Sequence, residues 1–293
     1  MPWIQLSLEA GDRDPDALSD LFAELGALSV TLEDAADQPL LEPAPGTTPL
    51  WSRTRVVALF PDSADTALLR GQLAERCGEA LAARIEQTTL DDRDWVRAWM
   101  DGFEPMRFGR RLWVCPSNVE PPEPDAVNLL LDPGLAFGSG THPTTALCLE
   151  WLDAHPPRGL AVLDYGCGSG ILAIAALKLG AARAVGVDLD PQALIASRDN
   201  AARNGLEGHV DARLPAELPA DEPFDLVLAN ILANPLIDLA AHLAGHLRPG
   251  GRLVLSGILA EQAAEVAEAY APWFEMASPV AQDGWVRLEG RRR

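Results

Sequence analysis

The stretch Val162-Leu163-Asp164-Tyr165-Gly166-Cys167-Gly168-Ser169-Gly170 decides the fold, together with the later segment Val185-Gly186-Val187-Asp188. The apolar beginning of the first stretch is typical of a buried parallel strand, and its glycines let the backbone turn sharply and approach a ligand. Residues 171–179 have helical spacing, so the glycines lie at a helix N-terminus. Asp188 closes a second strand, where a carboxylate can accept hydrogen bonds from ribose hydroxyls. The pattern predicts a nucleoside-binding turn.

The spacing of the glycines argues against a dinucleotide. A dinucleotide fold uses G-x-G-x-x-G, whereas here Ile171 occupies the place of the third glycine. The pattern G-x-G-x-G with a leading aspartate resembles the first motif of the class I S-adenosylmethionine-dependent methyltransferases. A glycine-rich turn without a ligand is the structural alternative, and Asp188 at the end of the next strand argues against it. The resemblance implies S-adenosyl-L-methionine as cofactor, bound by Asp164, Gly166, Gly168, Gly170 and Asp188.

Composition limits the class of protein. The chain has 293 residues, 48% of them hydrophobic, which is enough for two folded domains. The N-terminus leads into a strand-like segment with no secretory signal, and no apolar run has the length of a membrane span. We therefore expect a cytoplasmic location. A monomer is expected as well. The net charge of −20 argues against a direct nucleic-acid footprint. It suits a basic protein partner, or it serves solubility alone.

The hydrophobic pattern predicts two domains. The first ninety residues read as βαββαβ, with a helix over 65–84 and a last strand over 84–90, which predicts a small α+β ferredoxin-like domain over 1–90. A linker helix is expected over 91–104, where Trp95 and Trp99 are one turn apart, either gripping a substrate or simply packing. Residues 105–293 are expected to form the catalytic domain.

That second domain is predicted to be α/β, with a doubly wound, Rossmann-like parallel sheet. Strands are expected at 112–115 and 128–131 and then, alternating with helices, up to 252–256. A helix over 258–270 and closing strands over 274–277 and 285–289 complete the pattern. Gly166, Asp188 and Asn230 then all fall at the carboxyl ends of strands, where such sheets bind ligands.

A second unusual segment, residues 132–145, is rich in Gly, Ser and Thr and precedes a helix over 146–151. Thr144 or Thr145 could simply cap that helix. Capping does not explain three glycines and the pair His142-Pro143, so we interpret the segment as a loop that folds over a ligand.

The third segment, Asn230-Ile231-Leu232-Ala233-Asn234-Pro235, follows a strand. The Asn230 amide can accept a hydrogen bond from an amine nucleophile and orient its lone pair. Methyltransferases acting on planar nitrogens usually place adjacent prolines and an aromatic ring here. Their absence favours a flexible alkyl amine, the alternative being an asparagine that merely ends a strand.

No metal site is predicted. His242 and His246 are one turn apart on a helix, but Leu243 follows His242 where a zinc-binding H-E-x-x-H motif would need glutamate. A surface or capping role is expected for both. The four cysteines lack C-x-x-C spacing, so neither zinc nor a disulfide framework is indicated.

Several segments together resemble the PrmA family, which methylates ribosomal protein L11 of the bacterial large subunit. They are Asp94-Trp95, Trp99-Met100-Asp101, Pro105-Met106-Arg107-Phe108-Gly109, Ala136 through Thr145, Leu163 through Gly170 and Asn230-Ile231-Leu232-Ala233. The resemblance implies a protein methyltransferase that modifies lysine ε-amines and the N-terminal α-amine of L11, up to trimethylation. It implies cofactor contacts at Thr145, Gly166, Asp188 and Asn230, a catalytic role for Asn230 and Thr145, and substrate recognition by the N-terminal domain.

Two alternatives stay open. The enzyme could methylate another amine, such as a glutamine amide or a nucleobase. It could also be a cofactor-binding ribosome-assembly module without catalysis, although the intact Asn230 segment argues against that.

Overall fold

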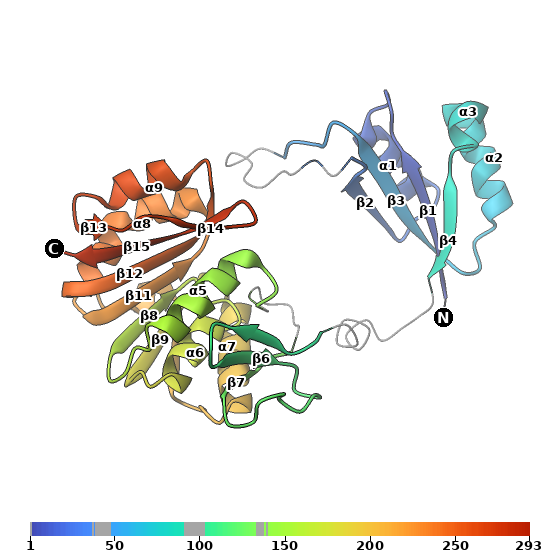
Figure 1. Ribbon diagram of the computed structural model, residues 1–293. Helices are drawn as coiled ribbons and strands as arrows, with labels where there is room; N and C mark the ends of the chain where they lie inside the picture. The colour runs from blue at the N-terminus through green and yellow to red at the C-terminus, as the bar shows by residue number, and fades with distance from the viewer. Residues whose placement is uncertain (1, 37, 39–47, 91–102, 133–137, 139) are drawn as a thin grey trace. The chain divides into compact units, whose positions relative to one another are not determined.

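The computed structural model describes residues 2–36, 38, 48–90, 103–132, 138 and 140–293. The chain divides into two compact units, Met1–Asp94 and Trp95–Arg293 (Figure 1). Only the last two residues of the expected linker helix, 103 and 104, are among the described residues, so Trp95 and Trp99 lie outside them. In the described part of the chain, no helix is long and apolar enough to cross a membrane.

The N-terminal unit is a four-stranded antiparallel sheet with the strand order β2-β3-β1-β4. Its elements are β1 (Trp3–Glu9), α1 (Pro15–Glu24), β2 (Ser29–Asp34), β3 (Thr54–Pro61), α2 (Thr66–Cys77), α3 (Glu79–Ala82) and β4 (Glu86–Leu90). Burial alternates along β1 and β3, so the sheet buries one face. That face and the helices form a core that includes Leu6, Phe22, Phe60 and Leu73.

The prediction of a single helix over 65–84 is wrong, because the helix is interrupted at Gly78. The glycine has φ +90° and ψ 148°, which lies outside the helical region and which residues with a Cβ rarely adopt. At the other end of α2, the Asp65 carboxylate caps the helix by accepting hydrogen bonds from the amides of Ala67 and Leu68, both at 3.0 Å.

The C-terminal unit begins with a three-stranded sheet of β5 (Met106–Phe108), β6 (Leu112–Cys115) and β7 (Val127–Leu130). The sequence pattern predicted β6 and β7 but not the short β5. The buried Asp153 holds this sheet to the helix α5 (Pro143–Ala154), because its carboxylate accepts hydrogen bonds from the Arg110 amide at 2.7 Å and Arg111 Nε at 3.2 Å.

The main sheet runs in the order β10-β9-β8-β11-β12-β15-β13, with β14 paired to β15. Its elements are β8 (Ala161–Tyr165), α6 (Ile171–Lys178), β9 (Arg183–Val187), α7 (Pro191–Arg203), β10 (Val210–Arg213), the 3-10 turn η1 (Pro215–Glu217), β11 (Phe224–Asn230), α8 (Ala233–His246), β12 (Leu247–Leu259), α9 (Ala263–Tyr270), β13 (Phe274–Met276), β14 (Val280–Gln282) and β15 (Trp285–Arg292). Strand order reverses between β8 and β11, as in doubly wound sheets.

The predicted parallel sheet is mixed. The strands from β10 to β12 are parallel, but β15 pairs antiparallel with both β12 and β13. The helix expected over 258–270 is also wrong at its start, since β12 continues to Leu259 and α9 begins at Ala263. The residues of 258–259 pair with β15, so sheet partners distant in sequence decide their conformation.

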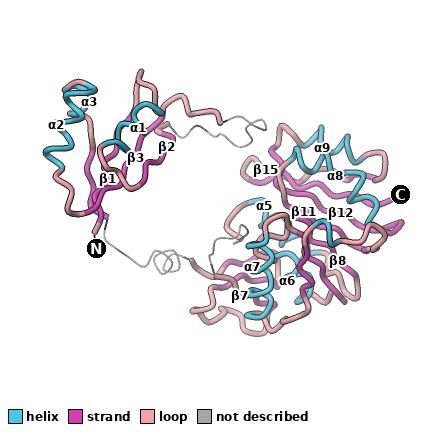
Figure 2. The backbone as a smooth tube through the Cα atoms, turned by 180° about the vertical axis from the view of Figure 1, so that it is seen from behind, coloured by secondary structure: helices cyan, strands magenta, loops and turns pink. Residues whose placement is uncertain are grey.

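Helices cover both faces of the main sheet (Figure 2), and an apolar core lies on each face. One core joins α5 and α6 to the sheet, and the other joins α8 and α9 to its opposite face. All five residues of β8 are buried, as expected for a strand covered on both faces. The result is a three-layered α/β unit in which the buried strand β8 leads into the glycine turn.

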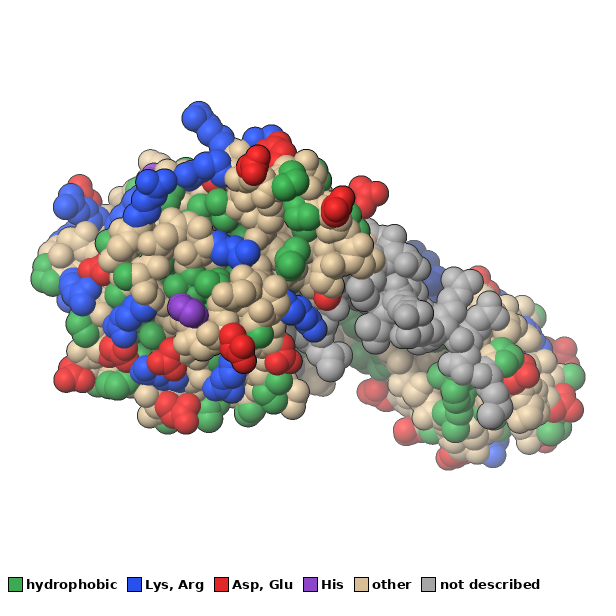
Figure 3. Space-filling view, turned by 90° about the horizontal axis from the view of Figure 1, so that it is seen from below, with side chains coloured by type: hydrophobic (Ala, Val, Ile, Leu, Met, Phe, Trp, Pro, Cys, Tyr) green, Lys and Arg blue, Asp and Glu red, His purple; other side chains and the backbone are tan. Residues whose placement is uncertain are grey.

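Charge is distributed unevenly between the units. Residues 1–94 contain 18 Asp and Glu against 7 Arg, so a third of the chain carries more than half of its net charge. Figure 3 shows basic and acidic side chains interspersed on one face of the larger unit.

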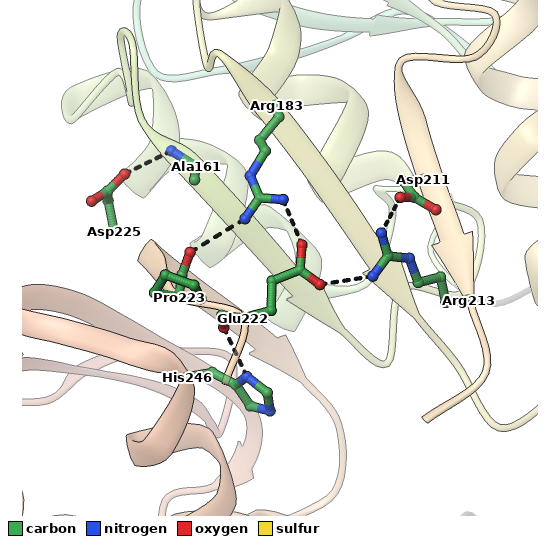
Figure 4. A network of polar contacts seen from close by, with 8 residues as sticks. All are labelled: Ala161, Arg183, Asp211, Arg213, Glu222, Pro223, Asp225 and His246. Carbon is green, nitrogen blue, oxygen red and sulfur yellow. Dashed lines mark hydrogen bonds and ion pairs between the residues drawn. The ribbon is translucent and has the colours of Figure 1, made fainter. Parts of the chain in front are cut away.

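A network of hydrogen bonds and ion pairs holds the loop before β11 in place (Figure 4). The Glu222 carboxylate accepts hydrogen bonds from Arg183 at 2.5 Å and Arg213 at 2.7 Å. Burial alone would raise the pKa of Glu222, but these hydrogen bonds outweigh it and lower the pKa. His246 is buried beside this loop, with Nδ1 3.1 Å from the Glu222 carbonyl oxygen. The surface or capping role expected for His246 is therefore wrong, because its ring packs edge-on against Phe224.

Candidate active site

The glycine turn between β8 and α6 depends on three left-handed residues. Gly166, Gly168 and Gly170 have φ values of +80°, +52° and +77°, which residues with a Cβ rarely adopt. The amides of Gly166 and Cys167 donate to the Val187 carbonyl at 2.7 and 3.0 Å. A Cβ on Gly170 would lie 3.1 Å from the Ser197 Cα. The turn is thus packed tightly against the end of β9 and against α7.

Asp188 follows β9 and lies at the same edge of the sheet. Its Oδ2 accepts a hydrogen bond from the Gly168 amide at 2.9 Å, and its Oδ1 accepts one from the Asp190 amide at 3.0 Å. These two bonds hold the carboxylate beside the glycine turn, where the sequence placed the ribose contact.

A cavity of about 480 Å³ opens at this edge, within the usual range for small-molecule sites. Five of the seven predicted site residues line it: Thr145, Gly166, Gly168, Asp188 and Asn230. Sequence reasoning missed the apolar walls, which are formed mainly by Tyr165, Leu172, Val187, Leu189, Pro215, Ile231, Leu232, Pro235 and Leu239. Five of these residues lay within the motifs that the sequence analysis singled out: Tyr165 and Val187 beside the glycine turn and Asp188, and Ile231, Leu232 and Pro235 after Asn230. Leu189 is 83% exposed, so a large apolar side chain faces the open mouth.

The other two predicted residues, Asp164 and Gly170, do not line the cavity. Asp164 lies beneath the turn, where its Oδ2 accepts a hydrogen bond from the Ala173 amide of α6 at 3.0 Å. Its Oδ1 is buried and has no hydrogen-bond partner among the described residues. Burial raises the pKa of Asp164 from 3.8 to about 7. Asp164 therefore supports the turn from within the core.

Asn230 and Thr145 come together across 85 residues of sequence. Asn230 ends β11, and Thr145 lies fully buried in the first turn of α5. The Asn230 amide Nδ2 donates to Thr145 Oγ1 at 3.3 Å. This hydrogen bond fixes the orientation of the Asn230 amide at the cavity wall. The nitrogen is the atom that donates to Thr145, and the oxygen therefore takes the other position.

His142, rather than Thr144 or Thr145, caps α5. Its Nδ1 lies 2.8 Å from Thr144 Oγ1 and accepts from the Thr144 amide at 3.4 Å. The ring also packs edge-on against Trp285, with 4.8 Å between centroids. Burial lowers the pKa of His142, which favours the neutral ring as an acceptor. Residues 133–137 and 139 of the predicted ligand loop lie outside the described residues, but Gly138 accepts a hydrogen bond from Ser169 Oγ at 2.6 Å.

His242 lies close to the cavity without lining it. Its ring packs edge-on against Tyr165 at 5.7 Å and against His246 at 4.7 Å. Burial, and then the nearby His246, lower the pKa of His242. In the part of the chain that the structure describes, no three His, Cys, Asp or Glu residues are grouped so as to hold a metal ion.

The buried Asp164 predicts a pH dependence of stability. A folded-state pKa above the unfolded value means that the native state keeps a proton that the unfolded chain releases. The stabilisation from Asp164 is therefore present below pH 3.8 and is lost as the pH rises through 7. The variant Asp164→Asn has no carboxyl group at this position, so it does not lose this stability as the pH rises. We expect the stability of the variant relative to wild type to increase from pH 4 to pH 8, by on the order of 4 kcal/mol.

Denaturant unfolding of both proteins across that pH range measures the difference. A constant difference in unfolding free energy would contradict the assignment of a raised pKa to Asp164.

Comparisons with known proteins agree over the whole chain. A family model described as ribosomal protein L11 methyltransferase (PrmA) matches residues 2–293. A ribosomal protein L11 methyltransferase from Azotobacter vinelandii is 60% identical over 299 residues, covering 100% of both chains. One from Marinobacter nauticus is 58% identical, covering 100% of this chain and 99% of its own.

A solved structure is also similar. The crystal structure of a ribosomal protein L11 methylase from Lactobacillus delbrueckii subsp. bulgaricus has a TM-score of 0.59 and 35% identity, and it covers 65% of this chain and 100% of its own. With the family match over nearly every residue, these similarities lead to one conclusion: the chain belongs to the ribosomal protein L11 methyltransferase (PrmA) family.

Proposed function

We propose that the protein transfers methyl groups from S-adenosyl-L-methionine to lysine ε-amines and the N-terminal α-amine of ribosomal protein L11, up to trimethylation. Family membership supports the reaction and the substrate. The observation that carries the proposal is the Asn230 amide, held by Thr145 at the wall of the cavity that also contains the glycine turn and Asp188. Donor and acceptor sites would then share one cavity.

The cavity suits this cofactor in shape and chemistry. The glycines of the turn have no side chains, so their backbone amides can come close to the cofactor. Asp188 offers a carboxylate to the ribose hydroxyls, and the apolar walls suit the flat base of the cofactor. When bound, the cofactor supplies a methyl group on a positively charged sulfur. Asp188 and the turn would bind and orient it, while the apolar walls exclude water.

Asn230 would orient the amine that receives the methyl group. Its side-chain oxygen can accept a hydrogen bond from a neutral amine and so direct the nitrogen lone pair, which is a contribution of alignment. A lysine amine is mostly charged at neutral pH, with a reference pKa of about 10.4. The apolar side chains of Ile231 and Leu232 next to Asn230 would lower that value by desolvation.

The N-terminal unit would recognise the substrate protein. Its βαββαβ order and the sheet order β2-β3-β1-β4 support a ferredoxin-like domain, with a boundary near residue 90 and a linker over 91–104. Its excess of acidic over basic residues suits a basic partner, since complementary charge speeds encounter. The same proposal includes a monomer acting in the cytoplasm without a direct nucleic-acid footprint.

The proposal predicts a specific mass change in the substrate. After incubation with the enzyme and S-adenosylmethionine, intact L11 should gain mass in steps of one methyl group, to three on any one amine. Intact-mass analysis followed by peptide mapping measures both the number and the positions. Labelling of RNA, or of glutamine amides, would favour the alternative acceptors, and no labelling of any component would favour a module without catalysis.

Two substitutions should separate cofactor binding from turnover. Asp188→Ala removes the ribose acceptor and should weaken cofactor binding about tenfold or more, as loss of hydrogen bonds to a charged group does. Asn230→Ala should mainly lower kcat, because its role is to align the amine. Calorimetry with the cofactor and steady-state kinetics with L11 measure the two effects.

The neighbouring Asp190→Ala provides the control. Asp190 also accepts a backbone amide, from Gln192 at 2.9 Å, but it does not line the cavity. Unchanged cofactor affinity in Asp188→Ala would show that the ribose assignment is wrong.

Removing the N-terminal unit should separate substrate recognition from cofactor binding. A protein lacking the residues before Asp91 keeps both apolar cores of the main sheet and should bind the cofactor with unchanged affinity. It should no longer methylate L11, because the recognition surface is gone. Calorimetry and the intact-mass assay measure the two properties, and retained methylation of intact L11 would contradict the role given to this unit.

A further inference from the structure

Ile231 occupies a slot between two glycines, one in the glycine turn and one in β12. It directly follows Asn230 and lines the cavity. On one side lies Gly166 of the glycine turn, and on the other lies Gly257 of β12. Neither glycine could carry a Cβ without striking Ile231, so three segments of chain meet at this residue.

Gly257 meets the backbone of Ile231. A Cβ on Gly257 would lie 2.2 Å from the Ile231 carbonyl oxygen and 2.8 Å from its carbonyl carbon, closer than real Cβ contacts. Gly257 also has φ +84°, and it lies where the pairing of β12 with β15 shifts register between Leu255 and Ile258. The irregularity in β12 thus lets the chain after Asn230 cross it at contact distance.

Gly166 meets the side chain of Ile231. A Cβ on Gly166 would lie 2.1 Å from Ile231 Cγ2. Isoleucine is branched at Cβ and has few rotamers, so Cγ2 cannot move aside as the end of a flexible side chain would. The side chain is therefore held against the turn while the carbonyl is held against β12.

We propose that Ile231 is a positioning residue for methyl transfer: wedged between Gly166 and Gly257, it determines where the Asn230 amide lies relative to the glycine turn. The inference rests on the function proposed above for Asn230. The link between Asn230 and α8 is only Ile231 and Leu232, which is too short to absorb a shift of the backbone. Ser256, the neighbour of Gly257, is paired in register with Asn230, so the crossing acts next to the amide itself.

The two glycines therefore have separate consequences. Movement of the Ile231 carbonyl by about an ångström should move the Asn230 amide off its bond to Thr145, and misplacements of this size cost about 10²-fold in rate. Asp188 and the amides of the glycine turn do not depend on that carbonyl. Their hydrogen bonds run to Gly168, Asp190 and Val187. Displacing Ile231 should thus affect turnover more than cofactor affinity.

The test compares Gly257→Ala with Gly208→Ala. Gly208 has a similar left-handed backbone, with φ +73°, but no atom lies within 4 Å of a Cβ placed there. Both variants carry the cost of alanine in that conformation, and only Gly257→Ala meets Ile231. We expect Gly257→Ala to lower kcat for L11 methylation by about 10²-fold while the Kd for S-adenosylmethionine changes much less. Gly208→Ala should keep the kcat of wild type.

A second pair of variants covers the case in which Gly257→Ala does not fold. Ile231→Ala removes Cγ2 and empties the slot, whereas Ile231→Val keeps both the Cβ branch and Cγ2. We expect Ile231→Ala to lose about tenfold in kcat and Ile231→Val to lose less. In the Ile231→Ala background, the further loss caused by Gly166→Ala should be smaller than in wild type, because the clash with Cγ2 is gone.

The results distinguish this inference from the proposed function. If wild-type protein does not methylate L11, the proposed function fails. If wild type is active but Gly257→Ala has the kcat of Gly208→Ala, or if Ile231→Ala and Ile231→Val lose kcat equally, the positioning role of Ile231 is wrong. A loss of cofactor affinity as large as the loss of kcat would also overturn it, because Ile231 would then serve as a cofactor contact.

Discussion

The reversal of strand order between β8 and β11 is the constraint on which the catalytic unit depends. Connections leave these neighbouring strands toward opposite sides, and a cavity opens at their carboxyl ends, as is usual where strand order reverses. One strand ends at Tyr165, directly before Gly166, and the other ends at Asn230. The turn that would hold the cofactor and the amide that would orient the amine therefore lie side by side. The close contact of Ile231 with Gly166 and Gly257 joins these two strand ends to β12.

Burial gives this edge of the sheet its chemical character. The walls of the cavity are mostly apolar, and its polar groups are few and held by hydrogen bonds, as the Asp188 carboxylate is by two amides. Methyl transfer to an amine needs alignment and a neutral nucleophile, and in the proposed function the apolar wall beside the fixed amide would provide both. The same burial acts on Asp164, whose pKa is raised to about 7 beneath the turn. Asp188 therefore lies at the wall of the cavity, whereas Asp164 lies buried beneath the turn.

The sequence predicted much of this site because its signals are local. Each signal can be recognised within a few residues: the glycine spacing, the aspartate after the next strand and the asparagine after a third strand. Parallel strands then bring these ends to the same edge of the sheet. The errors arose where distant residues decide the structure. β12 extends to Leu259 because β15 pairs with it, and His246 is buried because Phe224 and the loop at Glu222 cover it. The cap of α5 is His142, whose ring packs against Trp285.

The sequence by itself determined the class of fold, the turn at Gly166, and the residues Asp188 and Asn230, since these follow from the periodicity and spacing of neighbouring residues. Only the tertiary structure decided that Asp164 supports the turn instead of lining the cavity, and that Ile231 lies between two glycines 91 positions apart. The physical reason is that close packing depends on which backbones cross, and a crossing between separate strands leaves no periodic pattern along the chain.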